Sequence, residues 1–303
     1  MAHRMSVAFV EITATIAVTF TVVAQAPTNP SNDWSAVEQA LGRKGGMQPG
    51  EVIKFGFPRG DMQVIVNGVT VKPTLALGSW VAFKRVGKGA MMMGDLVLAE
   101  EEVGPVMAKL QAGGVEQTAL HNHVLLESPR VMYMHITAHG DPTKIATTIH
   151  DALAGTKTPL GPPAAPAPAG SPFELDTAVI ATALGVAGRV NGGVYQVSVP
   201  RSERIMEGGM EVPPSMGMAT AINFQPTGGG KAAITGDFVL TGPEVNPVIR
   251  ALQGGGIAVT AVHSHMLNES PRLFFMHFWA TGDAVALAAG LRAALDKTHW
   301  KKP

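Results

Sequence analysis

The sequence contains no cysteine among its 303 residues. This absence excludes disulfide bonds, zinc sites built on thiolates, a cysteine nucleophile and a lipid anchor on an N-terminal cysteine. The sequence also has no excess of either charge, because Lys plus Arg and Asp plus Glu both number 23. A neutral chain has no net field that attracts nucleic acid or anionic lipid. We therefore expect no nucleic-acid partner.

Several common enzyme motifs are absent as well. We find no glycine-rich phosphate loop, no Gly-x-Ser-x-Gly elbow and no His-Glu-x-x-His helix. At 46% hydrophobic and 15% charged residues, the composition is that of a folded globular protein rather than a disordered one. These features leave open whether the protein is an enzyme.

The first 26 residues resemble a secretory signal peptide. A weak positive start at His3 and Arg4 precedes a mostly apolar run over residues 7–23. Val22-Val23-Ala24 then places small residues before a cleavage site at Gln25. The apolar run is short for the about 20 residues of a membrane helix, so a removed signal at 1–26 is favoured over a retained anchor. We expect a periplasmic or secreted protein that is not held in the membrane after signal removal.

The remainder of the chain is a tandem duplication. Residues 121–135 and 263–277 both contain His-x-His, then Glu-Ser-Pro-Arg, then a final His, and they align without a gap at an offset of 142. The same offset relates residues 52–59 to residues 194–201, which both end in Pro-Arg. A segment rich in Pro and Ala separates the copies and favours an extended linker. We predict a repeat domain at 31–155, a linker at 156–172 and a second repeat domain at 173–300.

Each copy predicts an α+β fold. The later part of a copy has the pattern strand, helix, strand, strand, helix, which is typical of a ferredoxin-like split β-α-β core. Asp141-Pro142 is a strong helix start, because Asp caps a helix and Pro is tolerated at its first position. The earlier helix and strands are expected to extend the sheet. We predict two tandem repeats, each a mainly antiparallel sheet with helices on one face.

Three imidazoles and a carboxylate within fifteen residues are a typical set of metal ligands. On a strand, His121 and His123 point to the same face because residues two apart share a face. His135 lies on the returning strand, where cross-strand neighbours are within roughly 5–8 Å. Glu127, in the turn, is a candidate fourth ligand. The second copy repeats this set with the ligands His263, His265, Glu269 and His277.

Nitrogen and oxygen ligands without thiolate suit a divalent transition metal. Zinc and copper are the most favoured identities, and manganese, iron and nickel remain open. The 16 methionines, including Met91 to Met93, give slight support to copper, but methionine in an apolar strand more often serves packing. A structural role for buried histidines is the alternative. We favour metal binding because both copies keep the histidines and the glutamate while Tyr133 is replaced by Phe275.

Other charged residues near the motif have open interpretations. Arg130 and Arg272 could hold an anionic substrate group, or pair with the carboxylate and stabilise the turn. Asp95 and Asp237, each after a glycine, could orient a ligand imidazole or be turn or edge-strand residues. His139 has no counterpart in the second copy, where Thr281 stands. We therefore leave His139 out of the predicted site.

Three functions remain open from these residues. The first is an exported metal-binding protein with a site in each repeat, acting in copper or zinc handling. The second is a metal-dependent enzyme, a hydrolase before an oxidoreductase. In that enzyme Glu127 and Glu269 are general bases toward a metal-bound water, and Arg130 and Arg272 bind a small anionic substrate. The third is a structural or binding module without metal. The sequence determines neither the oligomeric state nor whether the two hairpins form two sites or meet.

At these motifs the chain resembles the LppY/LpqO-like family, which comprises exported bacterial proteins and lipoproteins classed as a domain of unknown function. The resemblance covers nearly the whole chain after the signal and implies export, but no activity. A weaker similarity concerns His121, His123 and Glu127, whose spacing matches the first motif of cupins. The next histidine follows only eight residues after Glu127, and the predicted helices disagree with a cupin barrel. We take this as a similarity of ligand spacing, not of fold.

Overall fold

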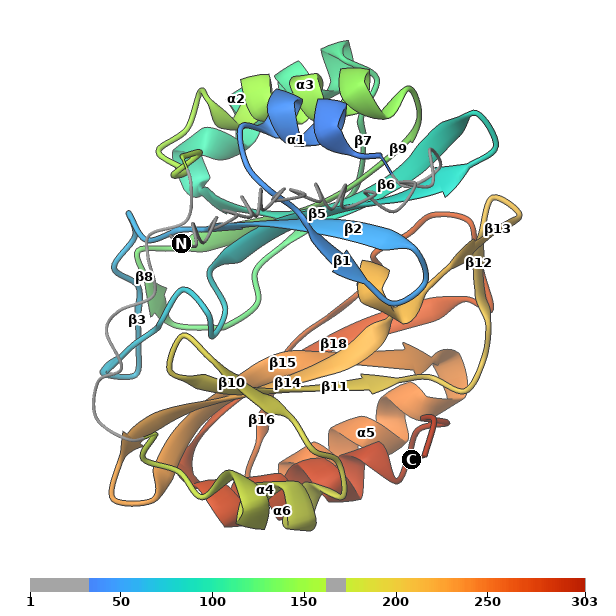
Figure 1. Ribbon diagram of the computed structural model, residues 1–303. Helices are drawn as coiled ribbons and strands as arrows, with labels where there is room; N and C mark the ends of the chain where they lie inside the picture. Colours follow the sequence, from blue (N-terminus) through green and yellow to red (C-terminus); the bar gives the residue numbers. More distant parts are fainter. Residues whose placement is uncertain (1–32, 162–172, 303) are drawn as a thin grey trace, which may run out of the picture. The chain divides into compact units, whose positions relative to one another are not determined.

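The computed structural model describes residues 33–161 and 173–302. The predicted signal peptide at 1–26 and most of the predicted linker lie outside these residues. Two six-stranded sheets dominate the described part, with strand orders β1-β2-β5-β6-β9-β7 and β10-β11-β14-β15-β18-β16 (Figure 1). Neighbouring strands in both sheets are antiparallel. The predicted α+β fold of two similar repeats is therefore confirmed.

The first repeat contains three helices, a short 3-10 helix and nine strands among the described residues. In chain order these are α1 (Ser35–Leu41), β1 (Gly46–Gln48), β2 (Val52–Pro58), β3 (Ile65–Val66), β4 (Val69–Thr70), β5 (Gly78–Val86), β6 (Gly89–Ala99), η2 (Glu100–Glu102), α2 (Val103–Ala112), β7 (Glu116–His121), β8 (Glu127–Ser128), β9 (Val131–Gly140) and α3 (Pro142–Leu153).

The second repeat follows the same plan over its described residues. Its elements are α4 (Thr177–Leu184), β10 (Arg189–Asn191), β11 (Val194–Pro200), β12 (Ile205–Glu207), β13 (Met210–Val212), η3 (Pro214–Met216), β14 (Ala219–Gly228), β15 (Lys231–Thr241), α5 (Gly242–Gly254), β16 (Ala258–His263), β17 (Glu269–Ser270), β18 (Leu273–Asp283) and α6 (Ala284–Leu295).

The last helix of each repeat begins where the sequence predicts. The side chain of Asp141 accepts hydrogen bonds from the backbone amides of Thr143 and Lys144, and Asp283 caps α6 in the same way. Ile145, buried in α3, faces the sheet with every fourth residue after it. Helices α1 to α3 cover one face of the first sheet, and α4 to α6 cover one face of the second (Figure 1).

Because successive side chains of a strand point to opposite faces, each sheet has a second face, which is turned toward the other repeat. In β9, Met134 and Ile136 pack in the core under the helices, whereas Tyr133 lies on the opposite face. Two apolar clusters on these opposite faces contain residues of both repeats. Examples from one cluster are Met91, Met93, Met216, Met218 and Met266, and from the other Val64, Val66, Tyr133, Val194 and Trp279. The two sheets therefore share a buried interface.

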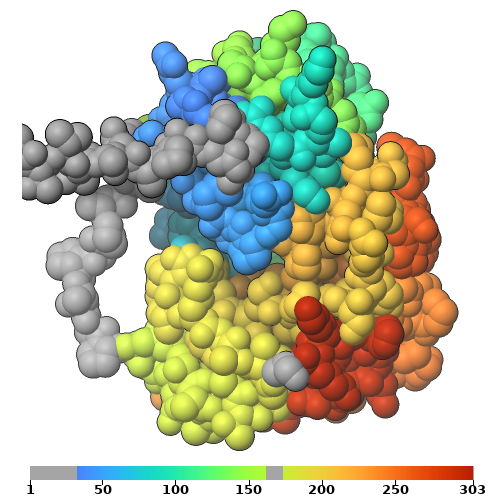
Figure 2. All heavy atoms as spheres, turned by 45° about the vertical axis from the view of Figure 1, so that its right-hand side comes forward, coloured from blue at the N-terminus to red at the C-terminus, as the bar shows by residue number. Residues whose placement is uncertain are grey.

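Polar contacts at the edge of this interface also join the repeats. In Figure 2 the gold segment of the second repeat lies directly against the blue segment of the first. There the Ser215 hydroxyl donates to the carbonyl of Pro49 at 2.8 Å, and Lys84 donates to the carbonyl of Glu211 at 3.0 Å. Among the described helices, none is long and apolar enough to span a membrane.

The structure differs from the sequence-based expectation for one early strand pair of each repeat. Strands β3 and β4 do not extend the main sheet but form a separate three-stranded sheet with β8. Asn67 and Gly68 both adopt positive φ, which closes a tight β3–β4 turn. Because β8 carries Glu127, the hairpin fixes the backbone of the Glu-Ser-Pro-Arg segment. Strand β17 and its Glu269 are held likewise by β12.

A β-bulge in each edge strand links the two histidine hairpins. Strand β7 pairs with β9 through Gln117 and Ala119, so Thr118 between them is the extra residue. Thr260 occupies the same place in β16. The Thr118 hydroxyl donates to the carbonyl of His265 at 2.6 Å, and the Thr260 hydroxyl donates to the carbonyl of His123 at 2.5 Å. Each bulge thus holds the histidine loop of the other repeat.

We expect Thr118→Val to lower the free energy of unfolding by about 1–2 kcal/mol. Valine keeps the shape of threonine but leaves the carbonyl of His265 without its donor. Urea denaturation followed by circular dichroism measures the change, and Thr260→Val is expected to give a similar loss. The matched control is Thr147→Val, since that exposed hydroxyl bonds only within α3. Unfolding free energies of all three variants within about 0.5 kcal/mol of the parent protein would contradict this prediction.

Candidate metal centre

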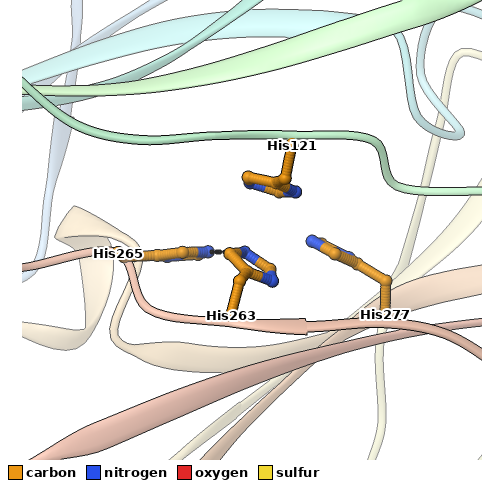
Figure 3. A group of neighbouring side chains, drawn as sticks. All are labelled: His121, His263, His265 and His277. Atoms are coloured by element: carbon orange, nitrogen blue, oxygen red, sulfur yellow. Dashed lines mark hydrogen bonds between the residues drawn. The ribbon is translucent and has the colours of Figure 1, made fainter.

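The six predicted histidines come together in one cluster between the two sheets. His121 ends β7, His135 lies within β9, and His123 follows in the loop after β7. Pairing of Ala119 with His135 and of His121 with Tyr133 puts these side chains on the face turned to the other repeat. The second repeat presents His263, His265 and His277 from β16, its loop and β18 in the same way. Figure 3 shows four of these rings, with those of the second repeat below His121.

The ring nitrogens lie close enough to form two groups that could hold a metal ion. One group contains His121, His263, His265 and His277, and the other contains His121, His123 and His135. Within each group the ligand atoms all lie within 4.8 Å of one another. Two nitrogens bound to one zinc ion at about 2.0–2.1 Å lie at most about 4.2 Å apart, so small ring movements would complete either group. His121 belongs to both groups, which differs from the predicted separate site in each repeat.

The rings pair across the two repeats, with two pairs stacked and the pair of His121 and His263 tilted. Ring centroids are 3.6 Å apart for His121 and His263, 3.6 Å for His135 and His265, and 3.8 Å for His123 and His277. An aromatic residue of the same repeat supports each loop histidine. Tyr133 stacks on His123 at 3.2 Å, and Phe275 stacks on His265 at 3.4 Å. The contacts of the two repeats are thus related by an approximate two-fold symmetry.

Most of these rings carry a buried nitrogen without a partner. Among the described residues, no hydrogen-bond partner is found for Nε2 of His121, His123, His135 and His277 or for Nδ1 of His263. Nδ1 of His277 bonds the carbonyl of Gly236 at 2.8 Å and must be the donor, which leaves the lone pair of Nε2 free. Burying an unpaired polar atom costs about 1–3 kcal/mol. A bound cation would satisfy several of these nitrogens at once.

Burial holds the imidazoles in the neutral form that metals require. Desolvation lowers the pKa of His121 to about 4 and that of His277 to about 3. Desolvation followed by the neighbouring imidazoles also lowers the pKa of His123 and of His265 well below the ordinary value. Because a neutral imidazole offers its lone pair without losing a proton, the cluster is prepared for a metal ion.

Two carboxyl groups lie within the cluster. Asp95 is the cross-strand partner of His135, and Asp237 is the cross-strand partner of His277. Burial raises the pKa of Asp95 to about 7, opposed by the charge of Lys54. Burial, with a further contribution from Asp95, raises the pKa of Asp237 well above its ordinary value. Both residues therefore lie beside the histidines rather than in a turn.

Glu127 and Glu269 belong to neither metal-ligand group. Glu127 Oε1 accepts a hydrogen bond from the amide of Val131 at 3.1 Å, and Glu269 Oε1 accepts one from Leu273 at 3.0 Å. Burial raises the pKa of Glu127 to about 7. Their predicted roles as ligands and as general bases stay predictions.

The two arginines differ between the repeats. Arg272 forms an ion pair with Glu269 at 3.3 Å and donates to Ser264 Oγ at 3.0 Å, as a turn-stabilising residue would. Arg130 is exposed. Anion binding by either residue stays a prediction.

Sequence reasoning missed the threonine contacts that position the loops. Thr118 and Thr260 are separated by the same offset of 142 as the histidines, which was a usable signal. Their role depends on a bulge and on the other repeat, and no local pattern indicates either. The methionines at 91–93 are buried in the sheet. Met91 and Met93 pack between the repeats, and Met92 packs under the helices.

A family model described as Domain of Unknown Function (DUF1259) matches the chain twice, at residues 35–155 and 178–297. These matches agree with the duplication, whereas the LppY/LpqO name stays a prediction. No match was found among curated proteins.

Two solved structures show a weak likeness. A trimeric bacterial microcompartment shell protein, PduB, is 12% identical over 84% of this chain and 89% of that chain, with a TM-score of 0.22. EtuB from Clostridium kluyveri is 11% identical over 83% and 88%, with a TM-score of 0.20. Scores this low carry no argument about fold or function.

We expect the metal-free protein to lose stability as the pH falls from about 6.5 to about 4. An imidazole whose pKa is lower in the folded state contributes stability above pH 6.5 that disappears as the unfolded chain takes up protons. Asp95, Asp237, Glu127 and Glu207, whose pKa values are raised by burial, act in the opposite direction, but six imidazoles outnumber four carboxyl groups. The free energy of unfolding should fall by at least about 1.4 kcal/mol per pH unit, the value for one net proton.

Urea denaturation in the presence of a chelator measures this slope. The control is the double variant His121→Phe and His263→Phe, which keeps an aromatic central pair but removes two titrating rings. Its slope should be smaller than that of the parent protein. A flat profile for the parent protein between pH 7 and pH 5 would show that the rings titrate normally.

Proposed function

The chain belongs to the family described as Domain of Unknown Function (DUF1259), and we propose that it is a metal-binding protein whose ion lies in the histidine cluster between its two repeats. One observation carries the proposal: neutral imidazoles from both repeats meet with buried, unpaired ring nitrogens at nearly the spacing of shared ligands. Histidines held only for packing would normally direct these nitrogens to hydrogen-bond partners.

The donor atoms favour a divalent transition metal, with zinc and copper the leading candidates. Imidazole suits zinc, copper, nickel and iron, and no thiolate is available to select among them. The methionines of the interface give copper no added support, because Met91 and Met93 are packing residues of a mixed apolar cluster. We propose metal handling, meaning uptake, storage or delivery, as the role that a site of this composition serves.

The geometry favours binding over catalysis. The hydrolase alternative needs Glu127 or Glu269 to act on a metal-bound water. Both oxygens of Glu269 are instead engaged, by the amide of Leu273 and by Arg272. Oε1 of Glu127 accepts from the amide of Val131, so only its Oε2 is left for such a role. The histidines also point at one another across the interface and are mostly buried. A site that two repeats enclose is better suited to holding an ion than to admitting a substrate.

We expect His121→Ala to weaken binding of Zn²⁺ and Cu²⁺ more than any other single histidine change. Over residues 33–161 and 173–302, His121 alone belongs to both ligand groups. Each metal is added to the purified, chelator-treated protein, and retained metal is measured by elemental analysis after gel filtration. We expect at least a tenfold loss of affinity for His121→Ala and a larger loss for the double variant His121→Ala and His263→Ala.

The matched control for these variants is His139→Ala. His139 lies on the same strand as His135, is exposed and belongs to neither ligand group. Its variant should bind metal as the parent protein does. Full metal content in the double variant, with its fold intact by circular dichroism, would refute the proposed function.

We further propose that the protein works outside the cytoplasm, in the periplasm or as a secreted protein. The proposal is supported by the signal-like composition of residues 1–26 and by the resemblance to an exported family. N-terminal sequencing of protein recovered from the periplasm is expected to begin at Gln25. Recovery of the chain only from the cytoplasm, with Met1 or Ala2 at its start, would contradict export.

A further inference from the structure

Asp95 and Asp237 occupy matching positions at the inner edge of the histidine cluster. Asp95 lies on β6 directly opposite His135 on β9, and Asp237 lies on β15 directly opposite His277 on β18. Cross-strand partners share a face of the sheet, so each carboxylate enters the cluster beside a histidine of its own repeat. Antiparallel pairing of the two central strands therefore positions the carboxylates in both repeats.

Each carboxylate approaches two histidines without a direct hydrogen bond to them. Asp95 Oδ2 is 3.8 Å from His123 Nε2, and Asp95 Oδ1 is 4.0 Å from His135 Nε2. Asp237 Oδ2 is 3.4 Å from His265 Nε2, and Asp237 Oδ1 is 3.9 Å from His277 Nδ1. Most of these separations are too long for a hydrogen bond. Two ligands at about 2.0–2.2 Å from one ion are roughly 3–4 Å apart, which covers the three distances to Nε2 atoms. The fourth distance places Asp237 beside the ring of His277, whose Nδ1 donates to the carbonyl of Gly236.

Neither carboxylate has a full set of protein partners. Among the described residues, Oδ1 of Asp95 and Oδ1 of Asp237 are buried without a hydrogen-bond partner. Asp95 is 7% exposed. Over the same part of the chain, the ion pairs found for these two residues are with histidines alone. The charge of Lys54 acts on Asp95 without forming an ion pair with it, and Asp237 accepts a backbone hydrogen bond at Met276. A buried carboxylate with an oxygen left unpartnered is still costly, and a metal ion would supply the missing charge.

We propose that the cluster is a two-metal centre in which Asp95 and Asp237 are ligands. This inference rests on the proposed function. One ion would take Asp95, His123 and His135, and the other would take Asp237, His265 and His277. His263 would complete the second set, and His121, whose ring nitrogens lie within reach of both sets, would complete the first.

Two ions follow from the symmetry of the contacts. Each carboxylate's near approaches are to the loop histidine and the strand histidine of its own repeat, and none of the four crosses to the other repeat. If Asp95 is a ligand of one ion, Asp237 is therefore a ligand of a second ion at the matching position of the other repeat. Two carboxylates would also offset part of the charge that two divalent ions bring together.

The test counts bound ions in the full chain. The chelator-treated protein is titrated with Zn²⁺, and bound metal is measured by calorimetry and by elemental analysis after gel filtration. The parent protein should bind two ions, and Asp95→Asn and Asp237→Asn should each retain one. At the affected site, the loss of affinity should exceed about a hundredfold, beyond the 10–100-fold typical of a partner outside the coordination sphere.

Glu116→Gln is the matched control, because Glu116 is an exposed carboxylate on β7 in the same sheet. It should bind two ions. Cadmium NMR of the parent protein counts the sites without any variant, so an Asp variant that fails to fold does not prevent the test. Two resonances are expected there.

The outcomes separate the two proposals. One ion per parent chain, or two ions retained by both Asp variants at less than a hundredfold loss, would overturn the two-metal centre and leave a histidine metal site. No bound ion in the parent protein would overturn the proposed function itself. A single cadmium resonance would also overturn the two-metal centre.

Discussion

The rest of this structure depends on one constraint. In each repeat, a sheet face that carries polar side chains is buried against the matching face of the other repeat. Strand alternation gives each sheet a face under helices and a face that needs another cover. The second face carries His135 in one repeat and His277 in the other, so covering it with the other repeat brings imidazole against imidazole. The rings stack on one another, but most of them keep a buried nitrogen without a hydrogen-bond partner among the described residues. The fold thereby collects neutral ligand atoms at its centre.

The two repeats agree at the centre of the interface and differ on its two sides. Met91 and Met266 on one side correspond to Ala233 and Val124 in the other repeat, and Trp279 on the opposite side corresponds to Thr137. Some bulky residues of the two mixed clusters therefore have a smaller counterpart in the other copy, although Tyr133 and Phe275 occupy matching positions. Two identical repeats would leave a gap on one side or overfill the other. This packing favours pairing of the first repeat with the second and so fixes which histidines face each other.

Local patterns in the sequence were sufficient for the elements but not for the site. Asp141 predicted a helix start, and the spacing of two residues predicted that His121 and His123 share a face, because both effects depend on neighbouring residues. The position of Glu127 could be predicted less well from the sequence. Pairing of β8 with β3 and the amide of Val131 fix its backbone and one of its oxygens, and both contacts are made after the chain folds back. That the two hairpins meet follows from sheet packing, for which the sequence contains no local signal.

Burial also orders the histidines along the path an ion would take from solvent. His135 and His277, on central strands, are 4% and 2% exposed, whereas His121 and His263 on the edge strands are only partly buried. An ion bound beside His135 or His277 would therefore lie behind the more exposed edge pair. The bulged threonines hold these edge strands together through the opposite loops. Because that pair would separate the ion from solvent, the contacts that hold the edge strands together would also slow its exchange.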